Sequence, residues 1–110
     1  MNAGRLRTKV TIQKLKSITD DDGFESETWE DYYTNYADAD QLYGTERWNA
    51  AQVNMDQAIR FTFRHHSQLD EVQPKYYRIV WKERIFTISF VDNPHYRNEE
   101  VRIDALEVRA

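Results

Sequence analysis

The residues best suited to catalysis or metal binding in this sequence are its histidines, His65, His66 and His95. His65 and His66 are adjacent at the end of an expected strand, where consecutive side chains point to opposite faces of a sheet. They therefore cannot hold one metal ion together, because the ligands of a metal site must converge on a single point. We interpret both as surface or strand-end residues.

An acidic stretch invites comparison with a calcium-binding loop. Asp20, Asp22 and Asp31 fall at the first, third and last positions of the twelve-residue EF-hand frame. Phe24 and Glu25 take positions where that frame needs an oxygen ligand and a glycine. Because Asp and Gly also favour tight turns, we expect a solvated turn here rather than a cation site.

A further pair of carboxylates, Asp38 and Asp40, shares one face of an expected strand, but no second cluster could help it to bind a metal ion or activate water. The chain has no cysteine and only three glycines, and it contains neither a phosphate-binding loop nor a nucleophile elbow. We therefore predict no catalytic residue, no metal site and no cofactor, and a protein that is not an enzyme.

The composition is that of one folded domain spanning residues 1–110. Apolar residues make up 40% and charged residues 31% of the chain, which is too apolar for a disordered segment. No apolar run follows the basic N-terminus, so we expect neither a signal peptide nor a membrane span. We expect residues 1–8 to form a flexible arm. The net charge of −4 argues against a general affinity for phosphate backbones.

The stretch Tyr77–Val91 is typical of a β-hairpin, and we expect the other strands to assemble around it. Apolar and polar residues alternate in both halves. The expected inward faces consist of Tyr77, Ile79 and Trp81 in the first half and of Phe86, Ile88 and Phe90 in the second. The turn at Lys82-Glu83-Arg84 lacks the Asn-Gly or Asp-Gly pair, which leaves its type open.

The rest of the chain supplies further short strands. We expect them at Lys9–Leu15, at Thr28–Tyr33 and Tyr36–Leu42 joined by a bend or bulge near Thr34-Asn35, at Ala58–His65 and at Val101–Val108. A loop is expected over Ser17–Ser26. A change of phase in the last strand suggests a bulge, or burial on both sides, near Asp104-Ala105.

The insertion 43–57 changes period, and its helix formers and capping threonine predict a short helix over residues 44–53. The expected fold class is mainly β: a small antiparallel β-barrel or sandwich with one short helix in a mid-chain insertion.

Aromatic residues could also indicate a surface for single-stranded nucleic acid, which needs outward rings interleaved with Lys and Arg. Phe61, Phe63 and Phe86 instead alternate with polar residues as core residues do. The candidates left for outward stacking are Tyr32, Tyr43, Tyr76 and Tyr96.

An ordered set of short motifs resembles the phage head–tail joining proteins, a family of head completion, head closure or stopper proteins. The motifs are Gly4-Arg5-Leu6-Arg7, Lys9-Val10-Thr11-Ile12-Gln13, Gly23, Glu27-Thr28-Trp29, Tyr36-Ala37, Leu42-Tyr43-Gly44-Thr45-Glu46, Phe61-Thr62-Phe63-Arg64-His65, Arg78-Ile79-Val80-Trp81 and Phe86-Thr87-Ile88. They follow one another in the family's order over nearly the whole chain. The sequence departs at the hairpin turn, where family members often carry a glycine and this chain has Lys82-Glu83.

The resemblance implies a structural virion protein of a tailed phage or prophage, assembled in the bacterial cytoplasm. Such proteins form a homo-oligomeric ring beneath the portal and its adaptor, close the DNA-filled head and join it to tail proteins. Packaged double-stranded DNA would pass through the channel without sequence-specific binding, and no membrane partner is implied.

By the same resemblance, the insertion Tyr43–Gln57 would line or plug the channel. The candidate channel-lining residues are Glu46, Arg47, Asn49, Gln52, Asn54, Asp56 and Gln57, and the candidate assembly residues are Arg5, Leu6, Arg7 and Trp48. With Arg47 as its only cation, the insertion would let DNA slide. The same segment also fits an ordinary surface helix packed through Trp48.

Two other classes of function remain open. A tail completion or terminator protein would have a similar size and strand content and would bind the tail tube. A cellular small-barrel module would stay monomeric and bind a peptide or single-stranded nucleic acid.

Overall fold

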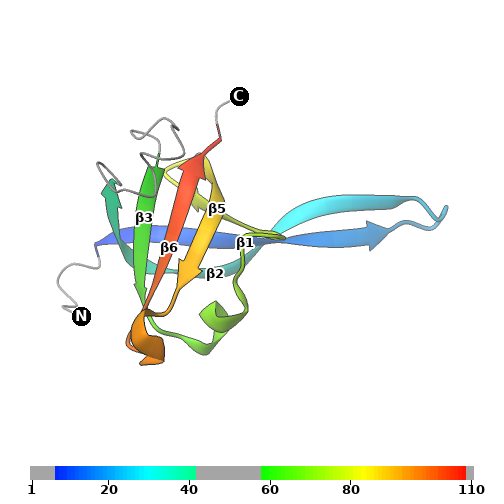
Figure 1. The fold of residues 1–110 in the computed structure, drawn as a ribbon. Coiled ribbons are helices and arrows are strands. Elements are labelled where there is room, and N and C mark those ends of the chain that lie inside the picture. The colour runs from blue at the N-terminus through cyan, green and yellow to red at the C-terminus, as the bar shows by residue number, and fades with distance from the viewer. Residues whose placement is uncertain (1–6, 42–57, 109–110) are drawn as a thin grey trace.

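The strands close into a six-stranded antiparallel barrel in the order β1-β2-β3-β6-β5-β4 (Figure 1). This computed structural model describes residues 7–41 and 58–108. The strands are β1 (Thr8–Thr19), β2 (Glu25–Gln41), β3 (Ala58–Arg64), β4 (Tyr77–Trp81), β5 (Arg84–Asp92) and β6 (Glu100–Glu107). The expected mainly-β fold is confirmed, whereas the helix predicted for the insertion lies outside the described residues.

Alternating apolar side chains from all six strands fill the barrel. Phe61 on β3 lies at the centre of an aromatic group, with its ring centroid 5.6 Å from Trp81 and 5.3 Å from Phe86. The fully buried large side chains are Val10, Ile12, Phe61, Phe63, Leu69, Ile79, Phe86 and Ile103, together with one charged residue, Asp104. Among the aromatic residues of β3 and of the β4–β5 hairpin, Phe61, Phe63, Tyr77 and Phe86 are therefore core residues, as their alternation predicts, and Trp81 packs half-buried against them.

The predicted Tyr77–Val91 hairpin forms with a two-residue turn at Lys82-Glu83, because Trp81 pairs directly with Arg84. The backbone φ angles of Lys82 and Glu83 are 51° and 63°. Positive φ at both central residues is the type I′ geometry, which matches the twist of the flanking strands. This is the turn at which the sequence departs from the glycine common in the family, and here two L-residues occupy the left-handed region.

Replacing Lys82-Glu83 with Asn-Gly is expected to raise the free energy of unfolding by about 1 kcal/mol, since these residues tolerate the left-handed region best. Urea denaturation followed by tryptophan fluorescence measures the change. The control is Lys82→Ala/Glu83→Ala, which removes the same charges but keeps both β-carbons. Equal stability of the two variants would contradict the role assigned to the turn backbone.

A β-bulge in β5 corrects one sequence expectation. Ile88 pairs with Ala105 and Phe90 with Asp104, so one residue of β5 is left over between them. The extra residue reverses the side-chain alternation. As a result Phe90, expected in the core, is 43% exposed. The bulge lies opposite Asp104-Ala105 but belongs to the partner strand. The alternative expectation of burial on both sides of β6 is confirmed, because the adjacent residues Asp104 and Ala105 are both buried.

The loop expected over Ser17–Ser26 is shorter than predicted, because β1 continues to Thr19 and β2 already begins at Glu25, which leaves a turn at residues 20–24. β2 is also one continuous strand rather than two segments. Its irregularity lies at Tyr32, since Ile12 pairs with Tyr33 and the next residue of β1 pairs with Asp31. The long pairing of β1 with β2 stabilises a stretch that carries the polar residues of a loop.

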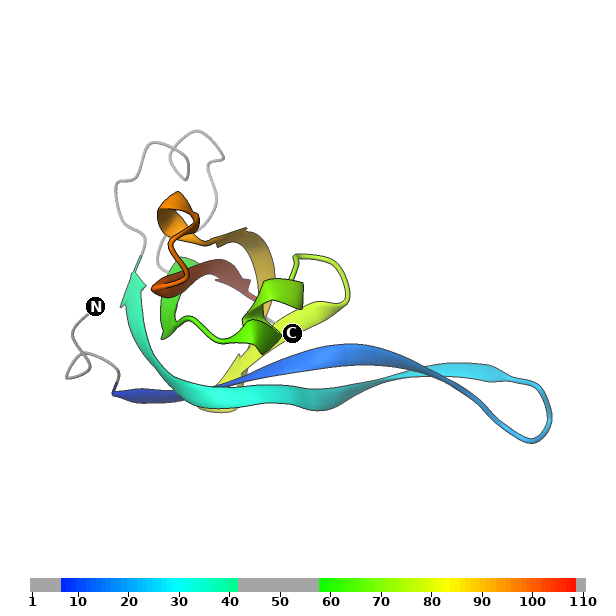
Figure 2. The same cartoon turned by 90° about the horizontal axis from the view of Figure 1, so that it is seen from below.

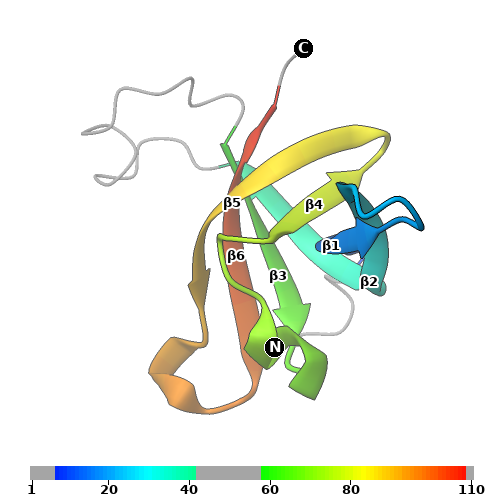
Figure 3. The same ribbon diagram turned by 90° about the vertical axis from the view of Figure 1, so that its right-hand side faces the viewer.

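The barrel has two different ends (Figures 1 and 3). At one end β2 finishes and β3 begins, next to the β4–β5 turn and the end of β6. At the other end lie two short 3-10 helices, η3 (Ser67–Glu71) and η4 (Pro94–Tyr96). The outer parts of β1 and β2 project sideways, away from both ends, as the view from below shows (Figure 2).

Candidate assembly surfaces

The feature that departs most from a plain barrel is a projecting two-stranded ribbon, residues 15–31, which we call the arm (Figure 1). β1 pairs with β4 only over Thr11–Lys14, whereas its pairing with β2 continues to Thr19. Five residues of β1 therefore extend beyond its pairing with β4. At about 3.3 Å per residue, this extension of the strand is roughly 17 Å long. Because an isolated two-stranded ribbon is marginal in water, the arm depends on its attachment.

The bulge at Tyr32 attaches the root of the arm to η3. The Tyr32 hydroxyl donates to the carbonyl oxygen of Gln68 at 2.7 Å and lies 3.2 Å from a Glu71 carboxylate oxygen. The Gln68 side-chain amide donates back to the Tyr32 carbonyl oxygen at 3.3 Å. The Tyr32 ring packs edge-on against Tyr77 with 5.4 Å between centroids. A bulge that redirects one side chain thus joins the arm to a distant part of the chain.

A second set of contacts joins the arm to β4. Arg78 donates from Nε to the Gln13 Oε1 atom at 2.8 Å, and Gln13 donates from Nε2 to Asp31 at 3.0 Å. The Arg78 guanidinium carbon lies 4.4 Å from the centre of the Trp29 ring. Burial lowers the pKa of Arg78, but an arginine remains charged throughout the physiological range. Attached on two sides, the arm has a defined direction.

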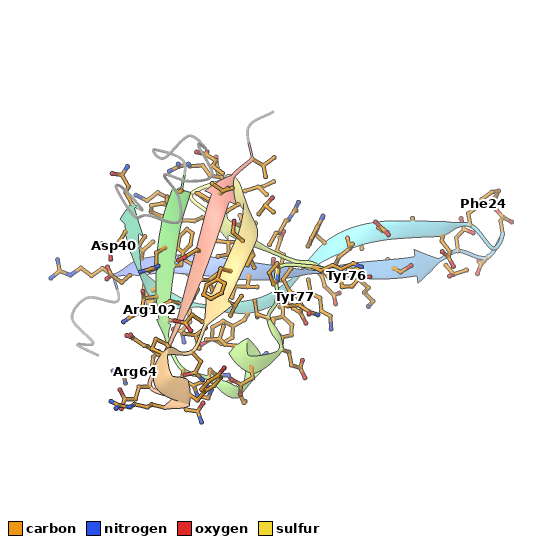
Figure 4. The ribbon with its side chains drawn as sticks, in the orientation of Figure 1. Phe24, Asp40, Arg64, Tyr76, Tyr77 and Arg102 are labelled. Atoms are coloured by element: carbon orange, nitrogen blue, oxygen red, sulfur yellow. The ribbon has the colours of Figure 1, made fainter. Side chains whose placement is uncertain are left out.

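The tip of the arm is a turn organised by Asp20. One Asp20 carboxylate oxygen accepts hydrogen bonds from the backbone N–H groups of Asp22 at 3.0 Å and Phe24 at 2.9 Å. Gly23 takes a φ of 84°, which suits glycine. This geometry agrees with the expected turn, in which the carboxylate caps the backbone. It leaves the Phe24 side chain 71% exposed at the far end of the arm (Figure 4).

Two paired strands, β2 and β3, anchor the insertion at one end of the barrel. Gln41, the last residue of β2, pairs with Ile59 on β3, so the chain leaves and returns on adjacent strands. The predicted channel-lining residues and Trp48 lie in the chain between these anchors, outside the described residues. Arg5 and Leu6 precede β1 and also lie outside the described residues. Arg7 is exposed immediately before β1.

Comparison with known proteins decides the family. Residues 1–108 match the sequence model of the phage head completion proteins. The chain belongs to the phage head completion protein family. The resemblance seen in the sequence motifs is thereby confirmed, and the role of this family member is a structural one in a phage head.

Two solved structures are similar to this family member. The solution structure of a protein from Shigella flexneri 2a has a TM-score of 0.74 and 25% identity, covering 97% of this chain and 96% of that one. A chain from the virion of a native gene transfer agent particle has a TM-score of 0.62 and 18% identity, covering 96% and 98% of the two chains. The second likeness shows a shared fold. A search of curated proteins gave no match.

Two of the histidines, His65 and His66, have structural partners. His65 Nε2 lies 2.9 Å from Asp70, and His66 Nδ1 accepts from the backbone N–H of Gln68 at 3.1 Å, which caps η3. Asp38 and Asp40 lie on β2 opposite Thr62 and Arg60 of β3. Within residues 7–41 and 58–108, no group of three or more acidic or histidine side chains could hold a metal ion. No helix in this part of the chain is long and apolar enough to cross a membrane.

Sequence reasoning missed the arm and its exposed Phe24. One signal could have indicated it: the β-branched residues Ile18, Thr19 and Thr28 on both sides of the turn. Of the proposed outward aromatic residues, Tyr76 and Tyr96 are exposed, whereas Tyr32 is half-buried at the arm root.

Ionisation of Tyr32 provides a test of the arm root. Burial and, second, the hydrogen bond to Glu71 raise the pKa of Tyr32 from 10.0 to about 12. Because the folded pKa exceeds the unfolded one, this stabilisation is complete below about pH 10 and is lost as the pH rises through about 12. The absorbance titration of the wild type, after subtraction of that of Tyr32→Phe, should show one phenolate ionisation with a pKa of about 12. An ionisation near the ordinary tyrosine pKa of 10.0 would contradict the contacts assigned to Tyr32 at the arm root.

Proposed function

We propose that this family member forms a ring beneath the portal and its adaptor, closes the DNA-filled head and joins it to the tail without catalysing a reaction. The observation that carries the proposal is the match of residues 1–108 to the phage head completion family. A closed barrel supports it, since a barrel leaves few open sheet edges and presents its surfaces as fixed faces. Assembly would take place in the bacterial cytoplasm and end in the virion.

The proposed channel element is the insertion 43–57. Its anchors on β2 and β3 are direct neighbours in the sheet, so the insertion can change its path without disturbing the barrel. Glu46 and Asp56 outnumber Arg47, the only cation of the segment. Such a lining makes few attractive contacts with phosphates and lets DNA move until the channel closes.

The proposed contacts within the ring involve Trp48 and the N-terminal residues Arg5, Leu6 and Arg7. Arg7 lies directly before β1, so residues 1–7 precede the barrel strands. Deleting Met1–Arg7 is therefore expected to leave the barrel folded while preventing its docking into a ring. Loss of the thermal unfolding transition in this variant would overturn the assignment.

Light scattering of the protein alone and with a purified portal–adaptor connector tests the proposed function. We expect stoichiometric addition at the symmetry of the connector. A protein that ignores the connector and binds tail tubes would be a tail completion protein. A persistent monomer that binds neither, but binds oligonucleotides or peptides, would be a small-barrel binding module.

Replacing residues 49–57 with a short Gly-Ser linker, which keeps Trp48 in place, separates ring formation from closure of the channel. The linker can span the gap because Gln41 and Ile59 are paired neighbours. We expect this variant to bind the connector normally but to leak packaged DNA. Full DNA retention would overturn the role of the insertion as a channel element.

A further inference from the structure

The tip of the arm combines an apolar side chain with negative charge. Phe24 is exposed at the end of the arm, and Asp20, Asp21, Asp22 and Glu25 surround it in the sequence without any Lys or Arg. A phenyl ring left in water at the far end of a projecting element is typical of an anchor that inserts into a partner. The partner surface should be apolar and edged with cations.

The same chain carries such a surface at the root of the arm. A groove of about 290 Å³ lies where the arm meets β4 and β5, and it is lined mainly by Trp29, Pro74, Tyr76, Ile85, Arg78 and Val108. Tyr76, Ile85 and Val108 are exposed although they are large and apolar. No lining residue is acidic.

Two cations lie against the aromatic rings of this groove. The Lys75 ammonium lies 4.9 Å from the centre of the Tyr76 ring, and the Arg78 guanidinium lies over Trp29. A cation held over an aromatic face keeps its charge available at the edge of an apolar site. The groove therefore complements both the phenyl ring and the carboxylates of the tip.

A second groove, between η3, β5 and η4, fits the tip less well. It is larger, about 450 Å³, but Asp70 is among its lining residues and neither Lys nor Arg lines it. An acidic tip would meet a carboxylate there rather than a cation, which disfavours docking.

The tip cannot reach the groove of its own chain. Figure 4 places Phe24 at the far end of the arm and Tyr76 at its root. The contacts of Tyr32 and Arg78 hold the arm pointing away from the barrel. Any contact between tip and groove is therefore a contact between two molecules.

We infer that the arm tip of one subunit docks through Phe24 into the Trp29–Tyr76–Ile85 groove of the next subunit, with the tip carboxylates beside Lys75 and Arg78. The contact is heterologous, since each copy gives one tip and accepts one, and repetition of such a contact around an axis closes a ring. It rests on the proposed ring function and specifies which surfaces meet.

Disulfide trapping tests the contact cleanly, because the chain contains no cysteine. The test variant is Asp22→Cys/Thr87→Cys, which keeps the Phe24 anchor and in which Thr87 is an exposed residue that lines the groove. The matched control is Asp22→Cys/Tyr96→Cys, since Tyr96 lines the second groove. Both are oxidised mildly, alone and on the portal–adaptor connector, and separated on a denaturing gel without reductant.

We expect a ladder of covalent multimers from the test variant and at most dimers, joined tip to tip, from the control. Connector binding without a ladder overturns the contact and leaves the proposed function standing. A ladder without connector binding supports the contact and overturns the proposed role. If the test variant gives no ladder and does not bind the connector, both the contact and the proposed function are overturned. A ladder in the control alone overturns the choice of groove.

Affinity measurements add an independent readout. Phe24→Ser should weaken self-association about tenfold or more, as expected for loss of an aromatic anchor. Lys75→Glu should weaken it about fivefold at low salt, and Asp21→Lys in the same chain should restore it. All three positions are exposed, so circular dichroism should show an unchanged fold. Absence of the charge-swap rescue would overturn the proposed orientation of tip and groove.

Discussion

Replacing Arg60 with methionine is expected to lower the free energy of unfolding by about 4 kcal/mol. In a marginally stable domain, such a loss is enough to unfold a large fraction of the molecules. Arg60 on β3 donates from Nε to Asp104 Oδ1 at 2.7 Å and from Nη2 to Asp104 Oδ2 at 3.2 Å. Asp104 is only 1% exposed, whereas the Arg60 side chain is 32% exposed. Removing the cation therefore leaves a carboxylate in the barrel wall without its bidentate partner.

The double variant Arg60→Met/Asp104→Leu is the decisive control. Two apolar side chains of similar size can replace a buried ion pair with little net cost, because the desolvation penalty disappears together with the attraction. We expect the double variant to recover most of the stability lost in Arg60→Met, as measured by urea denaturation. Equal losses in both variants would contradict the assignment of the loss to a buried carboxylate deprived of its bidentate partner.

Replacing Phe61 with alanine is expected to cost about 3–5 kcal/mol, the range found when a large aromatic core residue is truncated. Phe61 is fully buried and packs edge-on against both Trp81 and Phe86. These rings join β3 to the β4–β5 hairpin through the interior, so the cavity would lie among three strands. Such a cavity cannot collapse without shifting strands that are hydrogen-bonded into a closed ring.

The graded control for this prediction is Phe61→Leu, which keeps most of the apolar volume and should cost about 1–2 kcal/mol. Denaturant unfolding of the three proteins measures the series. A loss below about 1.5 kcal/mol for Phe61→Ala would mean that the barrel wall relaxes into the cavity and is less rigid than its pairing indicates.

The consequences for assembly follow from where these residues lie. Phe61 and Arg60 belong to the strand that begins after the insertion 43–57, and Arg60 pairs across the sheet with Asp104 of β6. Neither residue belongs to the arm or to its proposed groove. We therefore expect their variants to lose connector binding only in proportion to the unfolded fraction, whereas Phe24→Ser should lose self-association while fully folded.

Strict alternation of apolar and polar residues was sufficient to predict β3 and the β4–β5 hairpin. Phe61 and Phe63 on β3, and Ile79, Phe86 and Ile88 in the hairpin, are buried as predicted. The reason is local: a strand with one buried face must place its apolar residues at every second position. The ordered motifs likewise indicated the family, because their order and spacing are properties of the chain itself.

Other features were decided only by tertiary structure. The bulge that exposes Phe90 depends on how β5 pairs with β6, and the burial of Asp104 depends on an arginine 44 residues earlier in the chain. The polar composition of residues 17–26 predicted a loop, yet β1 and β2 stabilise each other as a ribbon mounted on the barrel through Tyr32 and Arg78. Residue types set which faces are buried, whereas register, bulges and long-range hydrogen bonds determine where the arm points and which surfaces it can reach.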